Sequence, residues 1–306
     1  MEFVHKPVLL SETLDALGIK PDGIYVDGTA GGAGHSREIA KRLEGGFLYA
    51  LDRDPDAVKT AAERLCGLPA KVINSKFSDM AEVLKNEGVA GADGILLDLG
   101  VSSFQLDNAE RGFSYRKEAP LDMRMSKSGI SAADIVNTYS AEELSRIFSE
   151  YGEEKFAFRI ARRIAEEREK SPILTTTALA DVIAGAYPAK ARREGNPARR
   201  CFQAIRIAVN GELDELNTAL DSAFSLLNKN GVLAIITFHS LEDRMVKQRF
   251  RSYTVGCICP PDIPVCVCGR KPQGALVSRK PIEPSEEEIN ENPRSRSAKL
   301  RAIRKI

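Results

Sequence analysis

Residues Gly23–Ser36, GIYVDGTAGGAGHS, join a short apolar run directly to a glycine-rich loop. Further apolar runs bounded by turn residues recur along the first hundred positions: Phe47–Asp52, Ala70–Asn74 and Gly94–Asp98. Runs without polar alternation are typical of strands buried on both faces, as in a parallel sheet. Helical patterns over 56–65 and 78–86 separate these runs, so the sequence predicts βαβ units and a doubly wound α/β sheet.

The alternation stops after the fourth run. Amphipathic helical patterns over 131–151, 153–169 and 176–186 take its place. The α/β pattern then resumes with a long helix over 197–227, a strand over 231–238 and a strand near 275–278. We therefore expect an α/β domain formed by residues 1–104 and 197–306, with an all-helical domain of residues 105–196 inserted into it.

The bulk composition limits the classes of protein. The chain has 306 residues, of which 43% are apolar, so it can bury a sizeable core. Its 44 Lys and Arg residues balance 43 Asp and Glu residues, which excludes a uniformly basic coat and leaves local patches for any RNA contact. No segment resembles a signal peptide or reaches the roughly 18 apolar residues of a membrane helix, so we expect a cytoplasmic protein with no membrane partner.

The glycine-rich loop, Asp27–Ser36, differs from a dinucleotide-binding loop because its glycines do not complete the G-x-G-x-x-G spacing. An acid at the start of the loop suits a cationic nucleoside cofactor, and Asp52 at the end of the second run can accept hydrogen bonds from two ribose hydroxyls. The alternative is that the glycines form only a tight turn and that Asp52 only caps the next helix. Their joint presence in the first βαβ unit favours nucleoside binding.

Two further side chains fall where the third and fourth strands are expected to end, the edge at which parallel sheets bind ligands. Phe77 has two interpretations, packing on an adenine face and filling the core. Asp98 ends an apolar run, where a carboxylate needs a partner, either a ligand amine or a backbone donor.

Several longer strings are more specific than these patterns. They are DGILLDLGVSS (93–103), QLD (105–107), ERGFS (110–114), PLDMRM (120–125), CFQAIRI (201–207) and TFHSLEDR (237–244). Together with His5, Pro7–Leu10 and the glycine-rich loop, they resemble the bacterial ribosomal small-subunit methyltransferase H family, also called the MraW family. The resemblance runs from about His5 to Arg304.

The resemblance implies a class I methyltransferase, with a Rossmann-like, doubly wound, mostly parallel seven-stranded sheet and an inserted helical domain for RNA recognition. It implies S-adenosylmethionine-dependent N4-methylation of a cytidine in the decoding centre of 16S rRNA, within the small ribosomal subunit. It assigns cofactor binding to the following residues: Ala33, Gly34, His35, Asp52, Phe77, Asp98 and Gln105. Glycine is common in the family at the position of Ala33, and we expect the added methyl to narrow the loop without abolishing binding.

Methyl transfer to cytosine N4 requires the amine to be held in line with the sulfonium carbon, and it requires a proton acceptor. Asp98 and a backbone carbonyl of the 99–103 loop are the candidates for that acceptor. His239 follows the fifth expected strand. One interpretation is that it orients the base or takes a proton, and the other is that it caps the following helix or bonds a backbone carbonyl.

Two groups of basic residues are candidates for RNA contact. The first lies around the return of the inserted domain: Lys190, Arg192, Arg193, Arg199 and Arg200. The second is the acid-free basic tail over 294–305. Phosphate contacts from such groups would hold the RNA while the target base leaves its stack. The arginines of the 153–169 helix are interpreted as a solvated face.

Four of the six cysteines crowd into twelve positions: Cys257, Cys259, Cys266 and Cys268. Four thiolates can hold a tetrahedral structural zinc ion, although Cys-x-Cys is tighter than the usual Cys-x-x-Cys spacing. Free buried thiols are the alternative. No His or carboxylate joins the cluster, which argues against a catalytic metal.

Two other functions fit parts of the pattern. A nicotinamide-dependent oxidoreductase would use a similar sheet, but the missing G-x-G-x-x-G motif opposes it. A non-catalytic RNA-binding ribosome assembly factor on the same fold would keep the helical insert, but the intact Asp27, Asp52 and Asp98 oppose it. The sequence leaves the oligomeric state open.

Overall fold

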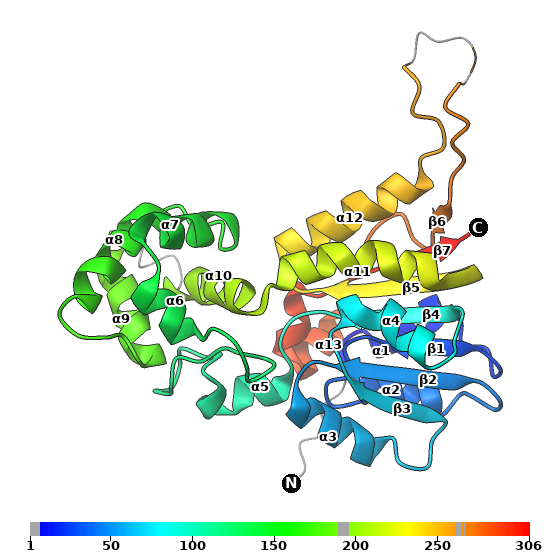
Figure 1. The fold of residues 1–306 in the computed structure, drawn as a ribbon, viewed down its shortest axis with the longest axis horizontal. Coiled ribbons are helices and arrows are strands. Elements are labelled where there is room, and N and C mark those ends of the chain that lie inside the picture. The colour runs from blue at the N-terminus through cyan, green and yellow to red at the C-terminus, as the bar shows by residue number, and fades with distance from the viewer. Residues whose placement is uncertain (1–6, 189–195, 261–264, 266) are drawn as a thin grey trace. The chain divides into compact units, whose positions relative to one another are not determined.

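The computed structural model describes residues 7–188, 196–260, 265 and 267–306. The chain forms two compact units, one of residues 1–100 and 214–306 and one of residues 101–213 (Figure 1). The first, here called the α/β unit, contains all seven strands found in the described part of the chain. The second is here called the helical unit. No helix among the described residues is long and apolar enough to span a bilayer.

One seven-stranded sheet forms the centre of the α/β unit, in the order β3-β2-β1-β4-β5-β7-β6. Its strands are β1 (Ile24–Asp27), β2 (Phe47–Asp52), β3 (Ala70–Asn74), β4 (Ala92–Asp98), β5 (Leu227–Thr237), β6 (Gly274–Leu276) and β7 (Lys299–Lys305). Strands β3 to β5 are parallel neighbours, whereas β7 pairs antiparallel with β5 and β6. The expected doubly wound, mostly parallel sheet is confirmed. Its strand order reverses between β1 and β4, where such sheets bind ligands.

Helices cover both faces of the sheet. Successive residues of a strand point to opposite sides, so an apolar strand presents apolar side chains on both faces. They are α1 (Leu10–Leu17), α2 (Gly34–Ala40), α3 (Pro55–Arg64), α4 (Met80–Asn86), α11 (Glu212–Leu226), α12 (Ser240–Thr254) and α13 (Glu286–Glu291). Leu96 of β4 packs into one core cluster with α1, α2 and α3. Its neighbours Ile95 and Leu97 pack into the opposite cluster with α4, α11 and α12. This burial on both sides explains why the strands lack polar alternation.

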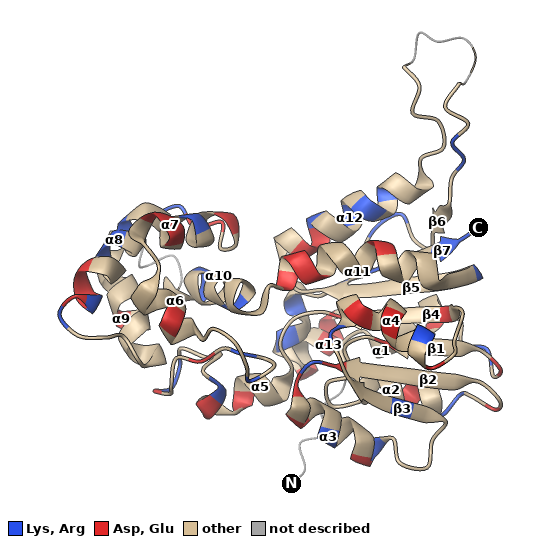
Figure 2. Ribbon diagram, in the orientation of Figure 1, with Lys and Arg blue, Asp and Glu red and all other residues tan. Residues whose placement is uncertain are grey.

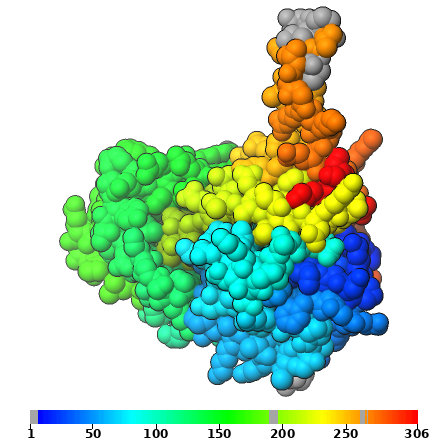
Figure 3. All heavy atoms as spheres, turned by 45° about the vertical axis from the view of Figure 1, so that its right-hand side comes forward, coloured from blue at the N-terminus to red at the C-terminus, as the bar shows by residue number. Residues whose placement is uncertain are grey.

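Helix α12 leads from the sheet into a long connection to β6. Its first turn carries acidic residues and its last turn carries Arg251, which complements the helix dipole (Figure 2). The segment of residues 255–273 that follows is here called the cysteine arm, and its described residues stand out from the rest of the α/β unit (Figure 3). Its described residues contain no helix or strand.

The helical unit has an apolar core of its own. Its helices are α5 (Ser103–Asp107), α6 (Ala132–Thr138), α7 (Ala141–Glu150), α8 (Ala157–Arg168), α9 (Thr176–Ala186) and α10 (Ala198–Asn210). The single helix expected over 131–151 is wrong, because Ser140 and Glu143 form a capping box that starts a second helix. The helix expected over 176–186 is confirmed.

The long helix expected over 197–227 is also interrupted. Gly211 adopts φ +60°, a left-handed conformation that ends α10, and α11 begins at the next residue. The apolar side of α10, which includes Cys201, Phe202 and Ile205, belongs to the core of the helical unit. The compact helical unit therefore extends to residue 213, beyond the boundary at 196 that the sequence pattern suggested.

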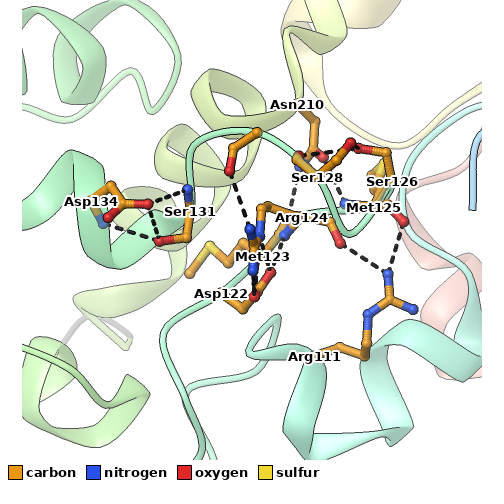
Figure 4. Close-up of polar contacts among 11 residues, drawn as sticks. Arg111, Asp122, Met123, Arg124, Met125, Ser126, Ser128, Ser131, Asp134 and Asn210 are labelled. Atoms are coloured by element: carbon orange, nitrogen blue, oxygen red, sulfur yellow. Dashed lines mark hydrogen bonds and ion pairs between the residues drawn. The ribbon is translucent and has the colours of Figure 1, made fainter.

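Two of the specific strings, ERGFS and PLDMRM, come together within the helical unit (Figure 4). The Nη2 group of Arg111 donates to the carbonyl oxygens of Arg124 and Met125, each at 2.9 Å. Asn210 at the end of α10 accepts from the Met125 N–H at 2.9 Å and donates to the Met123 carbonyl at 2.8 Å. Met123 is fully buried with φ +60°, so these bonds hold a strained loop in place.

Candidate active site

Asp27 organises the glycine-rich loop. Its side chain is 1% exposed at the end of β1. Oδ1 accepts hydrogen bonds from the Thr29 N–H at 3.0 Å and from Thr29 Oγ1 at 3.3 Å, and Oδ2 accepts one from Ser36 Oγ at 2.6 Å. Burial raises the pKa of Asp27, and these three hydrogen bonds oppose that rise. Sequence reasoning missed Thr29 and Ser36, although hydroxyls spaced two and nine residues after a strand-end acid were the available signal.

Local packing and backbone conformation explain the glycines of the loop. A Cβ at Gly28 would lie 2.5 Å from Leu97 Cδ2 and 2.9 Å from Phe77 Cβ, so only glycine fits between the ends of β4 and β3. Gly31 has φ +50°, and its N–H donates to Asp52 Oδ2 at 2.8 Å. Ala33 is buried and has φ +59°, a conformation that disfavours a residue with Cβ. The loop therefore passes directly over the end of β2.

Asp52 lies at that end, with its carboxylate partly exposed. Besides the Gly31 N–H, it accepts the Asp54 N–H at Oδ1, 2.8 Å away. Burial raises the pKa of Asp52 to about 6, with the two backbone donors acting in the opposite direction. The N-cap of α3 is Asp54, so the alternative in which Asp52 only caps the next helix is wrong. A carboxylate has about four acceptor positions, and Asp52 therefore retains capacity for further donors.

Asp98 ends β4 beside the loop, and its backbone N–H donates to Thr29 Oγ1 at 2.6 Å. Oδ1 of its carboxylate is buried and has no hydrogen-bond partner among the described residues. Burial, together with the negative charges of Asp27 and Glu242, raises the pKa of Asp98 to about 8. The site thus contains a carboxylate whose ionised form calls for a cationic or hydrogen-donating partner.

His35 faces this carboxylate from the first turn of α2 and is 5% exposed. Its Nε2 lies 3.0 Å from the carbonyl oxygen of Val8, which can only accept, so Nε2 carries a proton. Its Nδ1 lies 3.5 Å from Asp98 Oδ2. The two ring nitrogens therefore connect the segment before α1 to the end of β4.

A second acid approaches Asp98 from the segment after β5. Glu242 is 2% exposed, and its Oε2 accepts from the backbone N–H groups of Phe238 at 2.9 Å and His239 at 3.3 Å. His239 is the N-cap of α12, and its side chain accepts from the Glu242 N–H. Of the two interpretations of His239, the cap is confirmed. Sequence reasoning missed Glu242, although a capping residue followed three positions later by Glu was the signal.

The remaining predicted cofactor residues occupy different settings. Phe77 is half-buried at the start of a 3-10 turn and packs against the core cluster of α4 and α11, so both of its interpretations stay open. Position 34 requires a glycine, because a Cβ there would lie 2.5 Å from Pro7 Cγ. Gln105 is not among the residues that the α/β unit brings together. It lies in α5 of the helical unit, where Oε1 accepts from the Ser102 N–H at 3.0 Å.

The predicted basic groups have several different roles. Lys190, Arg192 and Arg193 lie outside the described residues, whereas Arg199 and Arg200 are exposed at the start of α10. In α8, Arg162 and Arg163 form ion pairs with acids one turn later, and both arginines are exposed. These two pairs agree with the solvated face expected there.

The basic C-terminal tail is largely a strand, which corrects its description as a simple charged patch. Arg301 of β7 is paired with Asp243 at 2.7 Å, and Lys305 Nζ donates to the carbonyls of Ser225 and Leu227. Arg294, Arg296 and Arg304 are exposed. The pairing with β5 explains why the apolar residues of the tail are buried.

Three members of the cysteine cluster come together in the cysteine arm. The Sγ atoms of Cys257, Cys259 and Cys268 all lie within 4.8 Å of one another, and Cys266 lies outside the described residues. Cys257 is exposed and the other two are half-buried, so the alternative of free buried thiols is wrong for these three.

Comparison with known proteins covers the whole chain. A family model described as the MraW methylase family matches residues 2–306. A curated relative from Clostridium botulinum (strain Loch Maree / Type A3), named Ribosomal RNA small subunit methyltransferase H, is 54% identical over 309 residues and matches 100% of both chains. A relative of the same name from Acetivibrio thermocellus is 56% identical over 313 residues, again with 100% of both chains covered. A solved structure of an rRNA methylase from Streptococcus thermophilus covers 99% of each chain at 11% identity, with a TM-score of 0.44.

Proposed function

The chain belongs to the MraW methylase family, and we propose that it uses S-adenosylmethionine to methylate N4 of a cytidine in the decoding centre of 16S rRNA. The names of the relatives support small-subunit ribosomal RNA as the substrate. The proposed substrate places the enzyme in the cytoplasm. The observation that carries the proposal is the carboxylate of Asp98 at the switch point of the sheet, whose buried Oδ1 has no hydrogen-bond partner among the described residues.

The residues of the α/β unit fit this cofactor. Asp52 retains acceptor capacity for the two ribose hydroxyls, and Phe77 offers an aromatic face to the adenine. The Ala33–His35 turn presents backbone groups beside them. Asp98 suits a cationic or N–H donor group of the cofactor, because such a partner would satisfy Oδ1 and stabilise the ionised carboxylate. Gln105 lies in the helical unit, and its part in cofactor binding is proposed from the family resemblance alone.

S-adenosylmethionine supplies an electrophilic methyl group on a sulfonium, and the residues of the chain supply position and proton handling. The cytosine N4 lone pair is delocalised into the ring, so the amine must be oriented in line, and positioning of this kind contributes up to roughly 7–11 kcal/mol. The N4 proton needs an acceptor. Asp98, whose pKa near 8 lies close to neutral pH, and a backbone carbonyl of the 99–103 loop remain the candidates.

We assign RNA recognition to the helical unit, together with exposed basic residues at the start of α10. A base in folded rRNA reaches such a site only after leaving its stack, and phosphate contacts offset the cost of that movement. Arg199 and Arg200 are exposed, and in the sequence they follow a segment that carries further basic residues. The substrate is proposed to be rRNA within the small subunit.

Methyl transfer from radiolabelled S-adenosylmethionine tests the proposal. Assembled small subunits and naked 16S rRNA are incubated separately, and the labelled nucleoside is identified by mass spectrometry. We expect N4-methylcytidine, with more label on the assembled subunit. Asp98→Asn should abolish transfer, while Glu44→Gln, at an exposed acid away from the site, should retain it. Label on neither RNA would refute the proposal, and so would label on another atom or base.

A further inference from the structure

Hydrogen bonds fasten the base of the cysteine arm to the α/β unit. Beyond the end of α12, the Gln273 N–H donates to the carbonyl of Tyr253 at 2.8 Å, and Arg270 Nη2 donates to the carbonyl of Ser252 at 2.6 Å. Above these two bonds, the described residues have no regular secondary structure. The described residues of the arm therefore form no backbone ladder that could hold its two sides together.

The described residues of the arm also form no apolar core. Three of their large apolar side chains are exposed to solvent, with Ile258 60% exposed, Val265 70% and Val267 77%. A short segment without buried apolar surface cannot offset the conformational entropy of its ordering, and proteins hold such segments with disulfides or metal ions. An ordered arm thus calls for a cross-link between its two sides.

The described thiols have the spacing of metal ligands. The Sγ atoms of Cys257 and Cys268, on opposite sides of the arm, are 3.8 Å apart. Tetrahedral zinc with Zn–S bonds of about 2.3 Å sets its sulfurs about 3.8 Å apart, whereas a disulfide joins them at about 2.0 Å. Cys257 and Cys259 are two positions apart, and in extended chain such residues face the same side.

The surroundings of the sulfurs suit thiolates. The backbone N–H of Cys259 donates to Cys257 Sγ at 3.4 Å, the kind of outer contact that stabilises a metal-bound thiolate. Arg270 and Lys271 follow Cys268 in the sequence after one glycine, and both carry positive charge. No carboxylate or imidazole among the described residues belongs to the group.

We propose that the cysteine arm holds a structural zinc ion on the thiolates of Cys257, Cys259 and Cys268. Each thiol loses its proton to solvent on binding, and zinc takes the three sulfurs without any change of oxidation state. Cys266 lies outside the described residues and is not part of the site as proposed. The ion fastens the two sides of the arm and fixes the positions from which Ile258 and Val267 project. The site is separate from the acids of the sheet and does not depend on methyl transfer.

Metal analysis of the full chain, purified under reducing conditions with its affinity tag removed, tests the site. We expect about one zinc per chain in the native protein and less than a tenth of that in the double variant Cys257→Ser/Cys268→Ser. Cys66→Ser, at an exposed cysteine outside the arm, is the matched control and should keep its zinc. Circular dichroism should show that the double variant keeps its helix content, so that loss of metal is not loss of fold.

Cobalt substitution gives a second readout. After removal of zinc by a chelator, cobalt should produce thiolate-to-metal charge-transfer absorption, and added zinc should bleach it. X-ray absorption should count at least three sulfur neighbours. The proposal is overturned by native protein that binds no zinc after exposure to it, by a double variant that keeps the metal, or by a Cys257–Cys268 disulfide in the reduced preparation.

Discussion

Asp98→Asn should stabilise the ligand-free α/β unit, and the gain should grow with pH. The raised pKa of the buried carboxyl, about 8 against an ordinary 3.8, means that the folded state keeps a proton that the unfolded state releases. Below about pH 3.8 both states are protonated and Asp98 has no effect. As pH rises from 3.8 to 8, stability is lost, and above 8 the loss is constant. The amide variant does not titrate at this position.

The magnitude follows from the separation of the two pKa values. Each pH unit between them changes the free energy of unfolding by about 1.4 kcal/mol, so the interval from pH 5 to pH 8 carries at most about 4 kcal/mol. A quarter of the Asp98 side chain remains exposed, and solvent screening reduces this limit. We therefore expect the difference between the variant and the native protein to grow by about 2 kcal/mol over this interval.

Hydrogen exchange measured in a urea series provides the assay. Peptides that cover β1 and β4 report the opening of the α/β unit separately from that of the helical unit. Glu44→Gln provides the control for removal of an exposed acid. If Asp98→Asn destabilises these strands, or if its effect is the same at pH 5 and pH 8, then the burial argument for Asp98 is refuted.

Three other predictions follow from the same contacts. Calorimetry should show that the affinity of the protein for S-adenosylhomocysteine rises about tenfold from pH 6 to pH 7 and levels off above about pH 8, because binding needs ionised Asp98. An affinity of the native protein that does not change with pH would contradict this. Urea unfolding should show that Gly28→Ala lowers the free energy of unfolding by about 1–3 kcal/mol, because the new Cβ would lie 2.5 Å from Leu97 Cδ2. Gly45→Ala, at a position with open space around it, is the control and should change the free energy of unfolding by less than about 0.5 kcal/mol. Asn210→Ala should destabilise the helical unit by about 2–4 kcal/mol, because the backbone groups of Met123 and Met125 lose their partners, and unchanged protection of α10 amides against exchange would show that the loop does not depend on them.

The sequence alone determined the α/β class, the positions of the first four strands along the chain and the place of the glycine-rich loop. These features are local: a strand buried on both faces needs an apolar run such as Leu48–Leu51, and a sharp turn over a sheet edge needs residues such as Gly31. The bounds of β2 and β3 were predicted without error for the same reason. Asp52 and Asp98 could be singled out because each ends such a run.

Only the tertiary structure decided how those acids are used. Glu242 approaches Asp98 from 144 positions further along the chain, so no local pattern could show that its charge lies near Asp98. Nor could a local pattern show that Asp98 Oδ1 has no hydrogen-bond partner among the described residues, while Asp27 accepts three hydrogen bonds. The same holds for α10, whose apolar side suits either unit until packing assigns it to the helical core. The basic tail likewise forms a strand because β7 pairs antiparallel with β5. Amino-acid order fixes which groups are present, but burial and charge at a site depend on neighbours that only folding brings near.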